Sequence, residues 1–448
     1  MGPGESGQSH YYPHGIPVRG TRGGVPPYAL VNVRPGRQMK ELAARAKAAL
    51  PATMDWTASL PPVRNQGSTP LCWDFAGIGA FEAAEILTRS LAPASVDYSE
   101  RMIGDYYPNA GGSLNMVASY LLTYGAVKEI DKPWTETQSA WTPNIPADRL
   151  VNSWCYLGNL NTAADIATLK AAVLQQPVGV ALKTAALDAW GDWSHQVAPA
   201  SVEAATTDTD HVVVLVGWDD GKPQSGGGVG AWKVRNSWGS GWGDNGYFWI
   251  GYTAAAIGSW AGFYPPAASE SYPTAMVPLI LDHGWDGGIW GWSNWHDVYM
   301  INQFTIPSSV NTNAVLQSID FAAPDSDLSY EVRVYSSFNH VTPSGLLASK
   351  SGQLSEAGCY SIRLDQPLAV EPLSTVYLWL HFHTAHADAY LVPIGQWGVD
   401  LPQRCYISSN ETGATWYDVN TSAHGQIVLR GRVVNGPNQV GTVWNAYE

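Results

Sequence analysis

The sequence predicts an α+β fold of two facing lobes, followed by an all-β sandwich. Three observations support this prediction. Helical patterns recur between residues 72 and 175, whereas residues 178–251 alternate or run apolar between glycine-rich turns, as strands do. After a linker-like stretch at 266–278, residues 279–448 contain only strand-like runs separated by turn clusters. Helices first and a sheet later, in one unit, indicate an α+β domain.

Length and composition narrow the function classes. A chain of 448 residues is too long for one ordinary core, so we expect two domains with extensions. With 45% hydrophobic and 14% charged residues, the chain is globular rather than disordered. The sequence has no run of 18 apolar residues, so we expect no membrane span. A net charge of −14 argues against nucleic acid as the main partner.

Three separated segments supply complementary chemical groups. Cys72 opens a predicted helix, where the helix dipole favours a thiolate over a thiol. His211 begins a predicted strand, and Asn236 lies beside tryptophans. Taken singly, such a cysteine, histidine or asparagine is usually structural. The order Cys–His–Asn, with Gln66 six positions before the cysteine, indicates a catalytic set instead.

These segments resemble the papain family of cysteine peptidases over roughly residues 50–265. The matching residues are Asn65-Gln66-Gly67, Cys72-Trp73, Asp210-His211, Asn236-Ser237-Trp238-Gly239-Ser240-Gly241-Trp242-Gly243 and Asn245-Gly246-Tyr247. The resemblance implies a two-lobed protease, with a helical lobe and a β-barrel-like lobe. It also implies a cysteine endopeptidase that acts on protein or peptide substrates and requires no cofactor for catalysis.

The resemblance assigns a role to each catalytic residue. Cys72 and His211 are expected to form a thiolate–imidazolium pair, in which a cysteine can have a pKa of roughly 3–4. Asn236 is expected to orient the imidazole. The Gln66 side chain and the Cys72 backbone N–H are expected to stabilise the oxyanion.

The resemblance also implies positions that contact the substrate. They are Gly111, Gly112, Leu114, Ala181, Val212, Ala261, Trp238 and Trp242. The two glycines correspond to the strip that pairs with the substrate backbone. The four apolar positions from Leu114 to Ala261 would line the P2 pocket and favour a bulky hydrophobic P2 side chain, unless they are merely core residues. Of the two tryptophans, Trp238 would shield the His–Asn hydrogen bond and Trp242 would lie on the primed side.

The sequence departs from the family pattern near the nucleophile. The family's cysteine three residues before the nucleophile is Thr69 here, and Asn109 stands where its partner is usual, so one disulfide is absent. Asp74 replaces a usual small residue. Two positions beyond Cys72 on a helix, Asp74 points about 200° away, so we expect it to perturb the thiolate only mildly.

Residues 1–50 resemble a short propeptide. The leader carries +5 and the remainder of the chain −19, so the two parts attract each other. Its apolar residues at helical spacing predict an amphipathic helix at 37–50, and these are Met39, Leu42, Ala43, Ala46 and Leu50. We expect the leader to lie across the cleft, to be cleaved between Arg45 and Ala52, and to be loosened by acid. The alternative is an extraneous, disordered tail.

Residues 279–448 resemble the lectin-like module of bacterial and archaeal surface cysteine proteases. The resemblance implies a glycan or cell-surface ligand and a secreted or cell-surface location, although the sequence shows no signal peptide. It also implies a structural calcium ion in this domain, and the candidate ligands are Asp282, Asp325 and Asp327. Among the four cysteines, Cys359 with Cys405 is the one plausible disulfide pair.

Two other function classes stay open at this point. One is a binding protein, an adhesin whose protease-like domain has lost activity. The other is a cysteine-dependent acyl transferase, such as a transpeptidase, that uses the same nucleophile. The intact set of Gln66, Cys72, His211 and Asn236 favours the peptidase over the adhesin.

Overall fold

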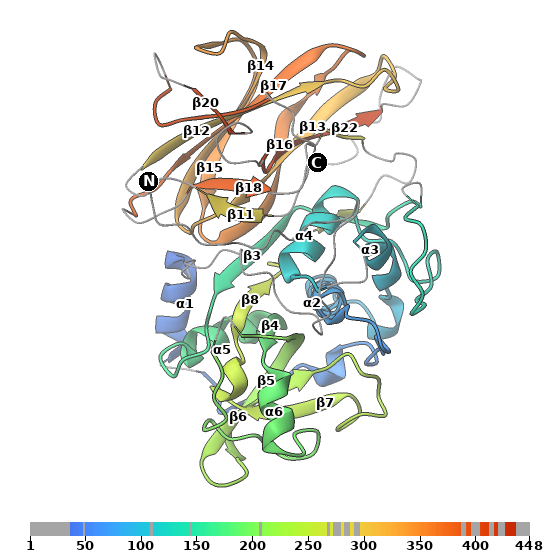
Figure 1. Cartoon of the computed structure of the whole chain (residues 1–448), viewed down its shortest axis with the longest axis vertical. Coiled ribbons are helices and arrows are strands. Elements are labelled where there is room, and N and C mark those ends of the chain that lie inside the picture. The colour runs from blue at the N-terminus through green and yellow to red at the C-terminus, as the bar shows by residue number, and fades with distance from the viewer. Residues whose placement is uncertain are drawn as a thin grey trace, which may run out of the picture.

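The chain was analysed as a computed structural model. The structure describes residues 36–47, 50–107, 111–142, 145–205, 208–266, 269–271, 279–281, 287–290, 296–386, 391–395, 404–411, 416–419 and 426–435. Two bodies are stacked along the long axis, with the helices in the lower body and the C-terminal strands in the upper one (Figure 1). None of the helices in the described ranges is long and apolar enough to cross a bilayer.

One lobe of the lower body is helical. It contains α2 (Cys72–Arg89), α3 (Glu100–Tyr106) and α4 (Leu114–Thr123). Helix α2 is central, and every side chain from its first residue to Ile86 is buried. A Cβ on Gly77 would lie 2.6 Å from the Val117 side chain, so this glycine lets α2 and α4 approach closely.

The other lobe is an antiparallel sheet in the order β8-β4-β5-β6-β7. Its strands are β4 (Val178–Leu182), β5 (His211–Pro223), β6 (Val229–Arg235), β7 (Tyr247–Gly251) and β8 (Ser259–Phe263), with β1 (Thr53–Asp55) paired to β5. Helices α5 (Ile166–Gln175) and α6 (Thr184–Trp190) accompany this lobe. Because β5 begins at His211 and α2 begins at Cys72, both residues lie at the start of a regular element. The predicted α+β class is confirmed.

The upper body is a β-sandwich, as predicted. In the described residues one sheet has the order β15-β14-β17-β12-β19-β20, and the opposing strands are β10, β22, β13 and β16. The Phe321 ring on β13 lies 5.4 Å from the Phe382 ring on β17, so side chains of both sheets share one core. The strands are β10 (Leu279–Leu281), β11 (Gly287–Trp290), β12 (Asp297–Thr305), β13 (Ala314–Ala323), β14 (Leu328–Phe338), β15 (Pro343–Leu354), β16 (Ala357–Ala369), β17 (Thr375–His383), β18 (Val392–Gly395), β19 (Cys405–Ser408), β20 (Tyr417–Asp418), β21 (Gln426–Ile427) and β22 (Leu429–Asn435).

The two bodies share one sheet, which the sequence did not predict. Strand β3 (Ser153–Gly158) pairs with β8 of the lower body and with β16 of the upper body, both antiparallel. The described strands thereby form a continuous eleven-stranded sheet, and Figure 1 shows β3 extending from one body toward the other. A Cβ on Gly358 would lie 1.9 Å from the Trp154 carbonyl oxygen, so the β3–β16 pairing requires glycine there.

The structure corrects two further predictions, one about the linker before the upper body and one about the cysteines. Within the expected linker, β9 (Ser269–Ser271) pairs with β2 (Arg149–Val151) of the lower body. Residues 269–271 are therefore regular structure, whereas residues 272–278 lie outside the described residues. All four cysteines are described and buried, and none of them forms a disulfide. The expected Cys359–Cys405 pair therefore does not form, and the two residues lie on β16 and β19 of different sheets.

The predicted leader helix forms as α1 (Arg37–Lys47), but it does not cover the cleft. It packs against α5, and Met39 is buried in the core of the sheet lobe. Its first turn meets the upper body, where Glu356 accepts hydrogen bonds from the Gly36 N–H at 2.6 Å and the Met39 N–H at 3.2 Å. Helix α1 itself therefore does not cross the cleft. Residues 1–35 lie outside the described part, so the prediction that the leader lies across the cleft stays a prediction for them.

Candidate active site

Cys72 and His211 line one cleft between the two lobes. The cleft has a volume of about 640 Å³. Its lining residues come from the loop before α2, the start of α6 and the start of β5, and they are Asn65, Gln66, Gly67, Ser68, Thr69, Pro70, Cys72, Thr184, Asp188, Asp210, His211 and Trp238. The fold therefore brings together the nucleophile and base candidates, which are 139 positions apart in the sequence.

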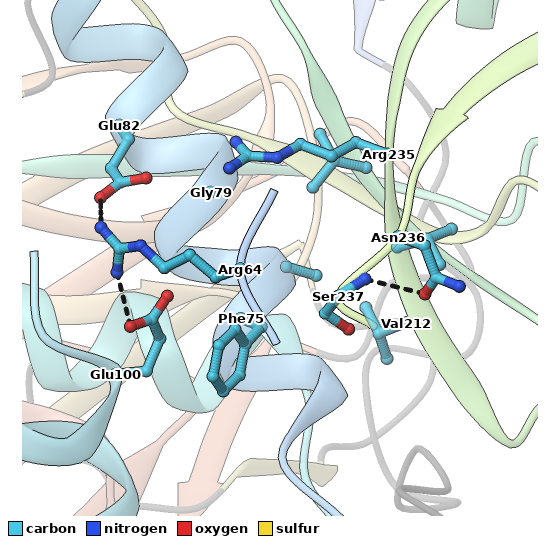
Figure 2. Close-up of a pocket in the computed structure, with 12 residues that line it drawn as sticks. Arg64, Phe75, Gly79, Glu82, Glu100, Val212, Arg235, Asn236 and Ser237 are labelled. Carbon is cyan, nitrogen blue, oxygen red and sulfur yellow. Dashed lines mark hydrogen bonds and ion pairs between the residues drawn. The ribbon is translucent and has the colours of Figure 1, made fainter. Parts of the chain in front are cut away.

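The histidine is oriented by the predicted asparagine. His211 Nε2 lies 2.8 Å from Asn236 Oδ1, and both side chains are buried. The Trp238 ring lies 4.9 Å from the imidazole, centroid to centroid, and covers it. Because Nε2 is engaged with Asn236, Nδ1 is the ring nitrogen left for exchange with the thiol. Figure 2 shows that Asn236 Oδ1 also accepts a hydrogen bond from the Ser237 N–H, at 2.8 Å.

The pKa of the Cys72 thiol differs from the prediction. Its side chain is only 1% exposed, and this burial raises the pKa of the thiol to about 12, with a further upward contribution from the Asp210 carboxylate. Backbone N–H groups of Val212, Trp73 and Cys72 itself act in the opposite direction because they stabilise the thiolate. The predicted strong depression of this pKa is wrong for this arrangement, because removal from water outweighs the helix terminus.

Both the oxygen and the nitrogen of the Gln66 side-chain amide form hydrogen bonds. Its Oε1 accepts a hydrogen bond from Ser237 Oγ at 2.6 Å, and its Nε2 donates to the Thr69 carbonyl oxygen at 2.7 Å. The Gln66 backbone N–H also donates to the Ser237 carbonyl oxygen at 2.8 Å. One of the two Nε2 hydrogens therefore remains for an oxyanion. Sequence reasoning missed the Ser237 hydroxyl, although Ser237 follows Asn236 directly.

A buried ionic group lies behind these residues (Figure 2). Arg64 contacts Glu82 on α2 at 2.7 Å and Glu100 on α3 at 2.6 Å. Burial raises the pKa of Glu100 to about 7. Arg235 Nη2 donates to the Pro62 carbonyl oxygen at 2.9 Å. These contacts tie the segment that carries Gln66 to both lobes, and no local pattern in the sequence indicates them.

Asp74 is more unusual than the sequence suggested. It is fully buried on α2, and neither carboxyl oxygen has a hydrogen-bond partner. Burial raises its pKa well above the ordinary value, and the nearby Glu100 carboxylate raises it further. Burial of this carboxyl group thus favours its neutral form, against the opposing effect of Arg101 and Arg64.

Three of the four predicted P2-pocket residues line a second, narrow cavity of only about 10 Å³, compared with about 640 Å³ for the cleft. Leu114, Ala181 and Val212 line it. Ala261 does not; it is fully buried in the core of the sheet lobe, and its neighbour Trp260 lines the pocket instead. The complete lining is Ser113, Leu114, Asn115, Trp154, Tyr156, Ala181, Val212 and Trp260.

The remaining predicted contacts have structural explanations. A Cβ on Gly112 would lie 2.3 Å from the Trp73 ring, so packing alone requires glycine there, while Gly111 is partly exposed. Trp242 lies against Trp238 at 5.1 Å and against Trp193 at 4.9 Å, centroid to centroid. Sequence reasoning missed Trp193, which completes this aromatic group beside the histidine.

The predicted calcium ligands do not converge. Asp325 Oδ2 lies 2.7 Å from His386 Nδ1, and Asp327 accepts hydrogen bonds from the Arg37 N–H at 2.9 and 3.0 Å. Asp282 lies outside the described residues. Within the described ranges, no three His, Cys, Asp or Glu side chains are grouped to hold a metal ion. These aspartates therefore do not fit a shared calcium site.

Comparisons with known proteins agree with this geometry. Residues 50–259 match the family model of papain family cysteine proteases, and residues 291–431 match that of a lectin-like domain. Ananain from Ananas comosus is 28% identical over 50% of this chain and 62% of its own length. The probable cysteine protease RD21C from Arabidopsis thaliana is 32% identical over 52% of each chain. Cysteine proteinase COT44 from Brassica napus is 30% identical over 51% of this chain and 67% of its own length. The chain thus spans only about half to two thirds of these curated relatives.

Solved structures show the same two-body architecture. The cysteine protease and lectin-like domains of Cwp84, a surface layer associated protein of Clostridium difficile, align with a TM-score of 0.68 at 16% identity. The alignment covers 90% of this chain and 98% of that one. Clostridial Cwp84 after propeptide cleavage aligns with a TM-score of 0.67 at 18% identity, covering 86% and 99%. The chain therefore belongs to the papain family of cysteine proteases, and a lectin-like domain follows its protease domain.

Proposed function

We propose that this protein is a cysteine endopeptidase with Cys72 as nucleophile, His211 as general base and acid, and Asn236 as the residue that orients the histidine. The observation that carries the proposal is the buried 2.8 Å contact between His211 and Asn236 in the cleft that Cys72 lines. An oriented imidazole beside a thiol is the arrangement that nucleophilic catalysis by cysteine needs.

The reaction runs in two halves. The Cys72 proton moves to His211 Nδ1, the sulfur attacks the peptide carbonyl carbon, and the carbonyl electron pair moves to oxygen. When this pair returns, the C–N bond breaks, and His211 gives its proton to the departing amine, which leaves a thioester on Cys72. A water molecule, deprotonated by His211, then releases the acid and restores the thiol.

The charge on sulfur is created during the reaction. Burial raises the pKa of the Cys72 thiol to about 12, which favours the neutral thiol before substrate binds. Proton transfer produces two opposite charges side by side, and the Val212, Trp73 and Cys72 N–H groups stabilise the sulfur anion. The free Nε2 hydrogen of Gln66 and the Cys72 N–H then stabilise the oxyanion, and one such donor contributes about 2.7–4 kcal/mol.

The proposed substrate is a polypeptide with a hydrophobic P2 side chain. Leu114, Ala181 and Val212 give the second cavity an apolar lining. Trp154, Tyr156 and Trp260 add large aromatic residues to its wall, so the P2 side chain that the pocket accepts is smaller than the four-residue prediction implied. A hydrophobic side chain gains free energy when it leaves water for such a lining.

The domain division and targeting are also part of the proposal. The protease domain comprises 51–265 and the lectin-like domain 279–448, with 1–50 as a propeptide-like leader of a zymogen. A glycan or cell-surface ligand of the lectin-like domain and a secreted or surface location are supported by the family match and by the surface-layer association of Cwp84. Helix α1 supports a leader that docks on the enzyme away from the cleft.

Product analysis with fluorogenic peptides tests the peptidase. The purified chain is incubated with peptides that carry different P2 residues, with and without an added primary amine. We expect a free carboxylic acid as product, at a rate independent of the amine. Amine-dependent transfer would instead establish an acyl transferase, and the absence of both products would establish a catalytically silent binding protein.

A further inference from the structure

Helix α4 ends in contact with two buried arginines of the lectin-like domain. On β22, Arg430 Nη1 donates to Thr123 Oγ1 and Arg432 Nη2 donates to the Leu122 carbonyl oxygen. This carbonyl belongs to the last turn of α4, where carbonyl groups lack partners within the helix. A cation is also favoured at this end by the helix dipole. Arg432 is held in turn by Asp320 at 3.0 Å, and both are almost fully buried.

Strand β3 is fixed by the same domain. Its residues Ser153–Tyr156 pair with residues 357–360 of β16, so the lectin-like domain supplies one complete edge of β3. The Ser361 N–H donates to the Asn152 carbonyl oxygen at 2.8 Å and extends this contact. Strand β8 then pairs with the other edge of β3.

The hydrophobic core of the helical lobe crosses the domain boundary. Ala357, Cys359 and Val428 of the lectin-like domain are buried in the same cluster as Leu122 of α4 and Trp154 of β3. A shared core of this kind moves as one unit, because packed interiors deform little. The lectin-like domain is therefore part of the packing of the helical lobe rather than a tethered module.

The walls of the P2 pocket lie on these same elements. Ser113, Leu114 and Asn115 are at the beginning of α4, Trp154 and Tyr156 are on β3, and Trp260 is on β8. Helix α4 has ten residues, so a constraint on its last turn acts about 15 Å away on its first. Six of the eight residues that line the pocket thus belong to elements that contact the lectin-like domain directly or through β3.

We propose that the lectin-like domain positions the P2 pocket of the protease, with Arg430 and Arg432 as positioning residues that set α4. This inference rests on the proposed peptidase function and adds a second role for the lectin-like domain, in substrate selection. Among the elements that line the pocket, it contacts α4 and β3 directly, whereas Cys72, His211 and Asn236 lie on α2 and on the sheet lobe. Weakening the contacts between the two domains should therefore alter the preference for the P2 side chain more than the reactivity of the Cys72 thiol.

The test uses the full chain and removes the buried charge pair without leaving either partner unpaired. The principal variant combines Arg432→Met with Asp320→Asn. A milder variant, Thr123→Val, removes the hydroxyl that accepts from Arg430 and donates to the Ser119 carbonyl oxygen at 2.7 Å. The matched control is Arg363→Met on β16, since Arg363 crosses the boundary to Glu270 at 3.2 Å but is exposed. The readouts are kcat and KM for two peptides that differ only in P2, leucine or glycine, and the rate of iodoacetamide labelling.

We expect the leucine-over-glycine ratio of kcat/KM to fall roughly ten-fold in the principal variant and less in Thr123→Val, mainly through KM for the leucine peptide. Iodoacetamide labelling should stay within about two-fold of wild type, and Arg363→Met should match wild type throughout. An unchanged ratio in Thr123→Val and in a folded principal variant would overturn the inference while leaving the peptidase intact. A wild-type chain that cleaves neither peptide would overturn both.

Discussion

The catalytic groups and the P2 pocket are built in different ways. Cys72, His211 and Asn236 all lie within the protease domain, each on a short recognisable motif, and His211 contacts Asn236 directly in the cleft that Cys72 also lines. The pocket beside them depends on α4 and β3, whose partners are two to three hundred positions away. The proposed chemistry thus depends on short local motifs, whereas the proposed P2 selectivity depends on the packing of two domains.

Loss of the nucleophile should have the largest effect. Cys72→Ala removes the atom that forms the thioester, so we expect kcat/KM to fall about 10⁶-fold. Progress curves with a fluorogenic peptide measure the loss. The variant should retain the wild-type thermal transition because it deletes one small buried atom, so an inactive variant that is also unfolded would not count as support.

Breaking the buried ion group should have the largest effect on stability. Arg64→Met leaves the buried carboxylates of Glu82 and Glu100 without their cation, so we expect the free energy of unfolding to fall by about 3–5 kcal/mol. Arg89→Met removes a more exposed pair with Glu85 and should cost less than about 1 kcal/mol. Equal effects in urea titrations of the two variants would refute this ranking.

Docking of α1 should depend on pH. Burial raises the pKa of Glu356 to about 7, above its ordinary value of 4.5, although the Gly36 and Met39 N–H groups oppose this shift. The folded state therefore holds this proton more tightly than the unfolded state. The resulting stability is fully present below pH 4.5 and is lost as pH rises through 7, by up to about 3 kcal/mol.

Glu356→Gln should flatten the pH dependence of the unfolding free energy between pH 5 and 8, measured by urea titration. Acid should therefore stabilise the folded chain through Glu356, which is the reverse of the expectation from the leader's net charge. A contact that weakens in wild type as pH falls from 7 to 5 would show that the charge attraction dominates.

Ser237→Ala should have the smallest effect. It removes the 2.6 Å hydrogen bond that fixes the Gln66 amide, and we expect kcat to fall roughly ten-fold, the equivalent of about 1.4 kcal/mol, with KM nearly unchanged. Ser237→Thr keeps the hydroxyl and should recover most of the rate. A change confined to KM would place Ser237 in substrate binding instead.

Much of the fold could be predicted from the sequence because its signals are local. Helical and strand periodicity predicted the α+β lobes and the sandwich, and the Cys–His–Asn order predicted which side chains share the cleft. The β3–β16 pairing could not be predicted, since about 200 residues separate the two strands and neither looks unusual. Burial of Cys72, which controls its pKa, likewise depends on packing between distant segments.

The error at Ala261 has a geometric cause. Successive side chains of a strand point to opposite faces, so an error of one position exchanges a pocket residue for a core residue. Trp260 has a φ of 55°, and the pairing of β8 with β4 is irregular between Gly179 and Ala181. The alternation of buried and pocket-facing side chains along β8 is therefore interrupted, and no pattern in the sequence indicates the position of this interruption.

Stoichiometric labelling by an epoxysuccinyl inhibitor tests most directly whether Cys72, activated by His211, is the nucleophile. Intact mass and peptide mapping are compared for wild type, Cys72→Ala and His211→Ala. We predict one adduct per wild-type chain, located on Cys72, none in Cys72→Ala, and greatly slowed labelling in His211→Ala. Labelling of a different cysteine, or equal labelling rates with and without His211, would contradict the proposed catalytic site.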